Sequence, residues 1–354
     1  MDDIKILKFN CGQIKNDQSI FDEYNDPKEY IVNAIGNRKV FILNPNFNEN
    51  DIALAIAVDK NLVVGSLVFI KSNINAKNST HHVLWLSSFF LDDKYRNSGA
   101  GAMLLFIALS YKVPLLASGG PSEACQALYK ASGFKQLNDL KRYLFFYDIS
   151  PIIKYIIGAN SLSNFISLLI NFIYKRIISV LIGFKRNHDM DYELVNEYDE
   201  SIDFLQEDEC FSFFAQDYKN LNWSIKICKK NTYPYKIYYE NKLIGVCLLR
   251  IKNESYNGLV MKVGSLNYYS YKKKHSHIKF KADLINFCKE FFLKKNVQVL
   301  EVQSYDKDLF KICKKSLMFH KGGNKVFFKG KKFDDQVLNN DIKYTKSISD
   351  VLFQ

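Results

Sequence analysis

The stretch that decides the fold is Tyr95-Arg96-Asn97-Ser98-Gly99-Ala100-Gly101-Ala102-Met103-Leu104-Leu105. It follows an apolar run at 83–91 that predicts a strand, and it opens a breaker-free apolar run at 99–111 that predicts a buried helix. Gly99 and Gly101 allow the backbone to approach a ligand closely. The free N–H groups of the helix start favour an anion, and Arg96 adds a cation beside them. The stretch therefore predicts an anion-binding loop between a strand and a helix.

The glycine spacing excludes two common nucleotide loops. Residue 104 is Leu, so the dinucleotide pattern Gly-x-Gly-x-x-Gly is not completed. No Gly-Lys-Ser or Gly-Lys-Thr follows, so the loop is not a P-loop.

The segments around this loop predict an α+β fold in two copies. The first unit has the order β-β-β-α-β-α-β, and residues 191–330 repeat that order with little sequence identity. In the first unit the predicted strands are 52–58, 62–70, 83–91, 113–117 and 142–149, and the helices are 99–111 and 122–132. In the second unit the strands are 236–240, 243–251, 259–266, 297–302 and 325–329, and the helices are 280–295 and 309–317. We therefore expect domains at 1–150 and 191–332, a linker at 151–190 and a tail at 333–354.

Length and composition fit two soluble globular domains. The chain has 354 residues, with 47% hydrophobic and 24% charged residues, which excludes a disordered or collagen-like chain. The seven cysteines form no Cys-x-x-Cys pair, and no cluster of His, Cys, Asp and Glu has the spacing of a metal site. The acidic N-terminus does not resemble a secretory signal. We expect a cytoplasmic protein without a bound metal.

The positive charge lies almost entirely outside the first domain. Residues 1–150 hold 16 of the 49 Lys and Arg and 15 of the 37 Asp and Glu, a net of +1, so the rest of the chain carries +11 of the total +12. This asymmetry suggests an anionic partner. A solvated lysine-rich face also explains the charge asymmetry, and it is the preferred interpretation.

The linker contains long apolar runs. Across 152–184 the only charges are Lys154, Lys175 and Arg176. On a helix, five polar residues would form a narrow stripe opposite a wide apolar face, and they are Asn164, Ser167, Asn171, Lys175 and Ser179. The charges at 175 and 176 interrupt the run that a membrane span needs. The preferred interpretation is a helix packed between the two domains, and the alternative is a helix lying on a membrane surface at the inner face of the membrane.

The first unit resembles the GCN5-related N-acetyltransferases. Arg96-x-x-Gly99-x-Gly101-Ala102 after a strand is similar to the acyl-coenzyme A pyrophosphate loop of that family. Ala127-Leu128-Tyr129-Lys130-Ala131-Ser132-Gly133-Phe134 is similar to the family's Leu-Tyr-x-x-x-Gly-Phe signature. The resemblance covers residues 40–150 and implies two acyl-CoA N-acyltransferase-like lobes, each with a mixed, mostly antiparallel sheet flanked by helices.

The resemblance implies a cofactor site and assigns its residues. The strand before the loop would offer backbone N–H groups to the pantetheine and the thioester oxygen of acetyl-CoA or another acyl-CoA. The implied cofactor contacts are Ser88, Phe89, Phe90, Leu91, Arg96, Asn97, Ser98, Gly99, Ala100, Gly101, Ala102 and Ser122. Ser122 departs from the family, which often has Asn near that position, and this weakens one expected contact.

The implied chemistry is direct attack of a primary amine on the thioester. Tyr129 matches the family's tyrosine near the coenzyme sulfur and would protonate the departing thiolate, although a core tyrosine is the alternative. Asp92 is the candidate base that takes the proton of the amine, although a solvated turn explains it as well. Asp93 and one of His81 or His82 are further candidates for the base.

The second unit lacks an Arg-x-x-Gly-x-Gly loop, so we expect it to have lost the cofactor site and to shape the acceptor pocket. An anionic acceptor, such as a nucleotide-linked or lipid-linked amino sugar for surface polysaccharide, would suit its charge. Two rivals stay open: a FemABX-like transferase that uses aminoacyl-tRNA to extend peptidoglycan, and a non-catalytic acyl-CoA-binding module. Protein N-acetylation is a third possible activity.

Overall fold

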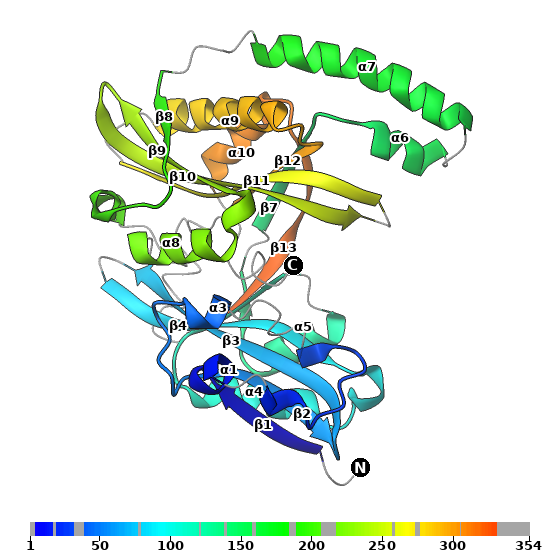
Figure 1. The fold of residues 1–354 in the computed structure, drawn as a ribbon, viewed down its shortest axis with the longest axis vertical. Helices are drawn as coiled ribbons and strands as arrows, with labels where there is room; N and C mark the ends of the chain where they lie inside the picture. Colours follow the sequence, from blue (N-terminus) through cyan, green and yellow to red (C-terminus); the bar gives the residue numbers. More distant parts are fainter. Residues whose placement is uncertain are drawn as a thin grey trace.

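The computed structural model describes residues 4–330 except 17–18, 32–38, 77–78, 120–121, 138–139, 158–160, 184–188, 207–216, 257–258, 273–276 and 305. The predicted tail at 333–354 lies outside the described residues. Two lobes lie one above the other, and one long strand runs through both (Figure 1). Each lobe is a mixed sheet of seven strands flanked by helices, so the predicted α+β fold with two lobes is confirmed.

The first sheet belongs mainly to the N-terminal third of the chain. Its spatial order is β1 (Ile4–Asn10), β2 (Ile52–Asp59), β3 (Leu62–Ala76), β4 (Ser79–Leu91), β5 (Leu115–Gly119) and β13 (Phe319–Lys329), with β6 (Lys135–Gln136) paired to β13. Neighbouring strands are antiparallel except β4 and β5, which are parallel. Helices α4 (Ala100–Ser110) and α5 (Glu123–Ala131) follow β4 and β5.

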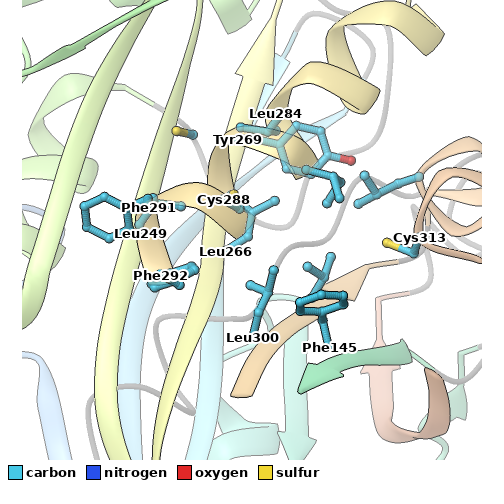
Figure 2. Close-up of a cluster of buried hydrophobic side chains, with 14 of the residues drawn as sticks. Phe145, Leu249, Leu266, Tyr269, Leu284, Cys288, Phe291, Phe292, Leu300 and Cys313 are labelled. Atoms are coloured by element: carbon cyan, nitrogen blue, oxygen red, sulfur yellow. The ribbon is translucent and has the colours of Figure 1, made fainter. Parts of the chain in front are cut away.

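The second sheet repeats this plan. Its spatial order is β13, β7 (Leu140–Phe146), β12 (Val299–Ser304), β11 (Leu259–Tyr271), β10 (Lys242–Tyr256), β9 (Thr232–Tyr239) and β8 (Asp191–Leu194). Helices α9 (His277–Lys294) and α10 (Lys307–Lys315) pack on one face, and Figure 2 shows Leu284, Cys288 and Phe292 meeting Leu266 and Leu300 there. The turns between β2 and β3 and between β9 and β10 use left-handed residues at Lys60, Glu240 and Asn241, which suits two-residue hairpins.

The two lobes exchange their last strands. The strand expected at 142–149 to close the first sheet is instead β7 in the second sheet, where it pairs antiparallel with β12. The strand expected at 325–329 to close the second unit is the end of β13, which pairs with β5 of the first sheet. The first half of β13 pairs with β7, so this strand belongs to both sheets. Each core is therefore completed by the other half of the chain.

The helix that packs between the lobes is α8 (Tyr218–Ile227), which the sequence analysis did not single out. Its Trp223 lies in the core of the first lobe, whereas Leu221 and Ile225 pack with the second. Asn46 Nδ2 of the first lobe donates to Asn220 Oδ1 of this helix at 2.7 Å. Helix α8 thus takes the place that we expected for the apolar linker.

The apolar linker lies on the outside of the molecule, which corrects the preferred interpretation of 152–184. It forms α6 (Ser150–Ile157) and α7 (Ser161–Gly183); α7 lies beyond α9, on the side of the second lobe away from the first, and α6 lies beside the second lobe (Figure 1). Among the described residues, no helix is both long and apolar enough to span a bilayer. Helices α1 (Cys11–Asn16) and α3 (Lys39–Ile42) pack against the first sheet.

Candidate functional site

A bulge in β4 opens the first sheet. Val68 pairs with Ser87 and Ser66 pairs with Phe90, so two residues of β4 stand opposite one residue of β3. Ser88 has a φ of 46°, in the left-handed region. A Cβ on the facing Gly65 would lie 2.8 Å from the carbonyl oxygen of Phe90, so only glycine fits this close approach. The bulge changes the direction of β4 between Ser87 and Phe90.

Beyond the bulge, β4 separates from β5. Among the described residues the two strands pair only from Leu84 to Leu86 and from Leu115 to Ala117, and residues 87–91 of β4 have no partner in β5. Backbone groups on this side of β4 can therefore contact a ligand, as the family resemblance implied for this strand.

The helix start predicted from the glycines faces the opening. Gly99, with φ 83°, caps α4 in the left-handed conformation, and Ser98 Oγ accepts a hydrogen bond from Ala100 N at 3.2 Å. A Cβ on Gly101 would lie 3.4 Å from Leu91 and 3.7 Å from Leu128. Both residues line the cavity described next, so a side chain at 101 would occupy the space at the mouth of the helix.

A cavity of about 840 Å³ fills the space between β4, α4 and α5. Eleven of the residues predicted for the site line it: Ser88, Phe89, Phe90, Leu91, Asp93, Arg96, Gly99, Gly101, Ala102, Ser122 and Tyr129. The predicted residues outside its lining are Asp92, Asn97, Ser98, Ala100 and the two histidines, His81 and His82. The structure therefore brings most of the predicted residues, which are up to 41 positions apart, around one space.

Two polar side chains of the cavity, Arg96 and Ser122, are placed to contact an anionic group of a ligand or to orient the rest of the ligand. Arg96 is half exposed, and its Nη2 lies 2.6 Å from Asp93 Oδ1, which orients the guanidinium. The other N–H groups of the guanidinium do not take part in this contact and can donate to a ligand. Ser122 caps α5, where its Oγ accepts from Cys125 N at 3.3 Å. The hydroxyl proton of Ser122 is thereby left available to a ligand.

Tyr129 is a buried residue of the cavity lining. Its ring lies between Phe89, Phe134 and Phe327 at centroid distances of 6.1, 4.9 and 5.5 Å. Burial, with Cys125 beside it, raises the pKa of the Tyr129 phenol well above its usual value. The phenol is therefore protonated at neutral pH, as a proton donor must be.

The contacts of Asp92 stabilise its charged form, which makes it a poor proton acceptor. Its carboxylate lies 2.6 Å from Lys28 Nζ and accepts a hydrogen bond from Lys94 N at 3.1 Å. The Lys28 contact, followed by the Lys94 amide, lowers the pKa of Asp92 below its usual value. A carboxylate held in its charged form takes up a proton poorly at neutral pH. The observed contacts tie the 26–31 segment to the end of β4.

The cavity residues that sequence reasoning did not assign to the site include Tyr30 and Cys125. Tyr30 comes from the N-terminal segment, where Asp26 Oδ1 accepts from Tyr30 N at 2.8 Å, and its ring stacks on Phe90 at 6.2 Å. The sequence Asp26-Pro27 is typical of a turn in which the aspartate side chain accepts from backbone N–H groups a few residues on. Nothing in this pattern indicates that the turn lies beside β4. Cys125 shares the cavity face of α5 with Tyr129, four residues on, and this spacing could have revealed it.

The second lobe has a bulge at the equivalent strand, β11, but side chains fill the space beyond it. Leu248 pairs with Tyr268 and Leu249 with Leu266, which leaves Asn267 as the extra residue of β11. The pairing of β11 with β12 also ends at Leu266, so these strands diverge as β4 and β5 do.

Buried side chains occupy that second gap. The Tyr269 hydroxyl donates to Asp306 Oδ2 at 2.8 Å, and Lys281 Nζ lies 2.6 Å from the same oxygen. Tyr271 stacks on Phe280 at 4.5 Å. Figure 2 shows Tyr269 among the apolar side chains of this core. The cluster of Tyr269, Lys281 and Asp306 thus links β11 to helix α9 and to the start of α10.

Among the residues that the structure describes, no group of three or more His, Cys, Asp and Glu side chains could hold a metal ion. The candidate site consists instead of backbone amides, the Arg96 guanidinium paired with the Asp93 carboxylate, hydroxyls, the Cys125 thiol and aromatic rings. Such a set suits a phosphorylated ligand with an apolar arm.

Solved structures of N-acyltransferases are similar to this two-lobed architecture. A GCN5-related N-acetyltransferase from Anabaena variabilis and a probable N-acyltransferase from Enterococcus faecalis are each 12% identical to the chain with TM-score 0.55, and the match covers 92% of this chain and 72% of each of them. Saccharomyces cerevisiae N-myristoyltransferase with bound myristoyl-CoA is 8% identical with TM-score 0.55, over 93% of this chain and 83% of that one. No family model and no curated protein matches the sequence. The chain has the fold of the GCN5-related N-acetyltransferases in a two-lobed form.

Proposed function

We propose that the first lobe transfers an acyl group from acyl-CoA to the nitrogen of a primary amine. The observation that carries this proposal is the cavity that starts at the β4 bulge and ends below the helix start at Gly99 and Gly101. Its volume of about 840 Å³ is that of a site for a large ligand. The structural relatives are N-acyltransferases, and some of them hold myristoyl-CoA.

The parts of the cavity divide the work of such a reaction. The N–H groups at the start of α4 and Arg96 would hold the pyrophosphate, and the splayed end of β4 would hold the pantetheine and the thioester oxygen. The amine nitrogen forms a bond to the thioester carbon, and the carbon–sulfur bond breaks. The amine passes a proton to Asp93, which lines the cavity, and Tyr129 donates its proton to the thiolate and is reprotonated from solvent.

For the acceptor we propose an anionic amino sugar, carried on a nucleotide or a lipid. The net charge of +11 outside residues 1–150 supports this choice, since it favours a negatively charged substrate. An amine panel that includes nucleotide-linked and uncharged amino sugars, with release of free coenzyme thiol as the readout, tests it. Equal rates with uncharged and anionic amines would contradict the choice of acceptor but leave the acyltransferase proposal standing.

Calorimetric titration with acetyl-CoA and myristoyl-CoA tests the site itself. We expect Gly101→Glu to abolish binding, because its side chain would fill the mouth of α4 with a negative charge. Phe106→Glu is the matched control: it adds the same charge to the same helix at a side chain that is 68% exposed and does not line the cavity. Absence of binding by the wild type, or equal loss in both variants, would contradict the proposal and favour the aminoacyl-tRNA alternative.

A further inference from the structure

Helix α7 presents its apolar residues to solvent. Eight large apolar side chains on it are between 42% and 68% exposed: Phe165, Leu168, Leu169, Ile170, Phe172, Ile173, Ile177 and Val180. They recur at spacings of one to four residues and cover most of the outer circumference of the helix. Figure 1 shows α7 at the outer edge of the second lobe, beyond α9. An exposed apolar face of this size on a folded chain indicates an interaction surface.

The inner side of α7 is a narrow stripe, polar in its first half. Ser167 and Asn171 are buried, and Asn171 Oδ1 accepts a hydrogen bond from Ile149 N at 3.2 Å. One turn further on, the Tyr174 hydroxyl donates to Phe146 O at 2.8 Å. Turning the apolar face inward would break these bonds and leave buried polar groups without partners, which is costly. The outward orientation is therefore set by specific contacts.

The charges within this segment are all basic, although one of them is paired with an acidic residue just outside it. Residues 149–188 contain no Asp or Glu, and they contain five basic residues: Lys154, Lys175, Arg176, Lys185 and Arg186. Lys175 Nζ lies 3.2 Å from Asp148 Oδ2. On the helix itself, the Arg176 guanidinium lies 5.4 Å from the centre of the Phe172 ring, at the middle of the apolar face. An apolar helical face with aromatic residues and only basic charge is typical of helices that lie in the interface of an anionic membrane.

We propose that α7 docks the protein on an anionic lipid surface, with Phe165, Phe172 and their apolar neighbours inserted between the headgroups. A second copy of the chain is a poorer partner for this face. An isologous contact would bring the basic segment 149–188 against itself, and Asp148, the acidic residue just before it, already pairs with Lys175. Anionic headgroups would supply negative charge to Arg176 and to the basic residues that flank the helix in sequence.

Co-sedimentation of the full chain with vesicles tests this proposal. We expect binding to vesicles of phosphatidylcholine with about one third phosphatidylglycerol, and at least about tenfold weaker binding to phosphatidylcholine alone. The variant Phe172→Ser/Ile173→Ser should lower the partition coefficient at least about tenfold, since two inserted side chains are lost.

The matched control is Phe106→Ser/Val260→Ser, which removes one phenylalanine and one β-branched residue that are 68% and 69% exposed elsewhere. It should bind as the wild type does. Failure of the wild type to bind anionic vesicles, or equal weakening in both variants, would overturn the proposal. A dimer in light scattering that Phe172→Ser/Ile173→Ser dissociates, without lipid binding by the wild type, would assign the face to a second copy instead.

Discussion

The guanidinium of Arg142 lies 2.9 Å from the carboxylate of Glu301, measured from Nε to Oε1, and this ion pair joins the two halves of the chain inside one sheet. Arg142 belongs to β7, the strand that the first half contributes to the second lobe, and Glu301 belongs to β12 beside it. The Glu301 side chain is fully buried. A charged pair therefore stands where the exchanged strand enters the second sheet.

Removing one partner of this pair should destabilise the protein strongly. We expect Arg142→Met to lower the free energy of unfolding by about 3–5 kcal/mol, because it leaves the Glu301 charge buried without its main partner. The double variant Arg142→Met/Glu301→Met should lose less, since no unpaired charge remains. Urea unfolding of both single variants and the double variant measures this. A single variant as stable as the wild type would show that the pair is hydrated in solution.

The strand exchange makes the cofactor site depend on the C-terminal strand. Phe327 of β13 is fully buried in the core of the first lobe, with its ring 5.5 Å from that of Tyr129. We expect Phe327→Ala to cost about 3–5 kcal/mol of stability and to weaken acyl-CoA binding. Phe319→Ala, in the exposed first half of the same strand, is the control. Equal effects of the two substitutions on binding would argue against the exchanged arrangement.

Tyr129→Phe tests the proton donor. The variant keeps the ring among Phe89, Phe134 and Phe327 and removes only the hydroxyl, so kcat should fall about 100-fold with little change in KM. Because the pKa of Tyr129 is raised well above its usual value, the wild-type rate should show no loss from its ionisation up to about pH 9. Cys125→Ala controls for packing beside the phenol. An unchanged kcat in Tyr129→Phe would make this residue a core tyrosine only.

Asp306 should contribute to the acid sensitivity of the second lobe. Burial raises its pKa, but hydrogen bonds from Lys281, Leu309 N and Tyr269 outweigh burial and leave the pKa below its usual value. A carboxyl group whose pKa is lowered by folding stabilises the protein above its unfolded pKa, near 3.9, and that contribution is lost as pH falls through the lower folded pKa.

Asp306→Asn should therefore weaken the pH dependence of stability in this acidic range. The amide can still cap α10, where the aspartate accepts from Leu309 N at 3.0 Å, so the helix start is retained. At neutral pH the variant should be less stable by about 3 kcal/mol, because Lys281 remains buried without its ion pair. Thermal unfolding between about pH 3 and pH 7 measures both effects. An unchanged slope would mean that Asp306 is not ionised in the folded protein.

Local features of the candidate site were predictable because each depends on neighbouring residues. Gly99 and Gly101 between an apolar strand and an apolar helix indicated the ligand-facing helix start, and Tyr129 follows on the next amphipathic helix. The place of Tyr30 was not predictable, since Lys28 and Asp92, 64 positions apart, bring its segment to β4. The strand β1 was missed because Lys5 and Lys8 interrupt its apolar pattern at the sheet edge.

The sequence by itself determined the central order of elements in each lobe, from β2 to α5 and from β9 to α10, together with the loop at 95–105 and the apolar character of 161–183, because hydrophobic periodicity and glycine placement act over a few residues. Only the tertiary structure decided which sheet each final strand joins. Strands β7 and β13 carry similar apolar patterns, and pairing partners are chosen by packing and buried charge, as with Arg142 and Glu301. It also decided that α7 turns its polar stripe inward, because Ile149 N and Phe146 O offer hydrogen bonds there that no local pattern reveals.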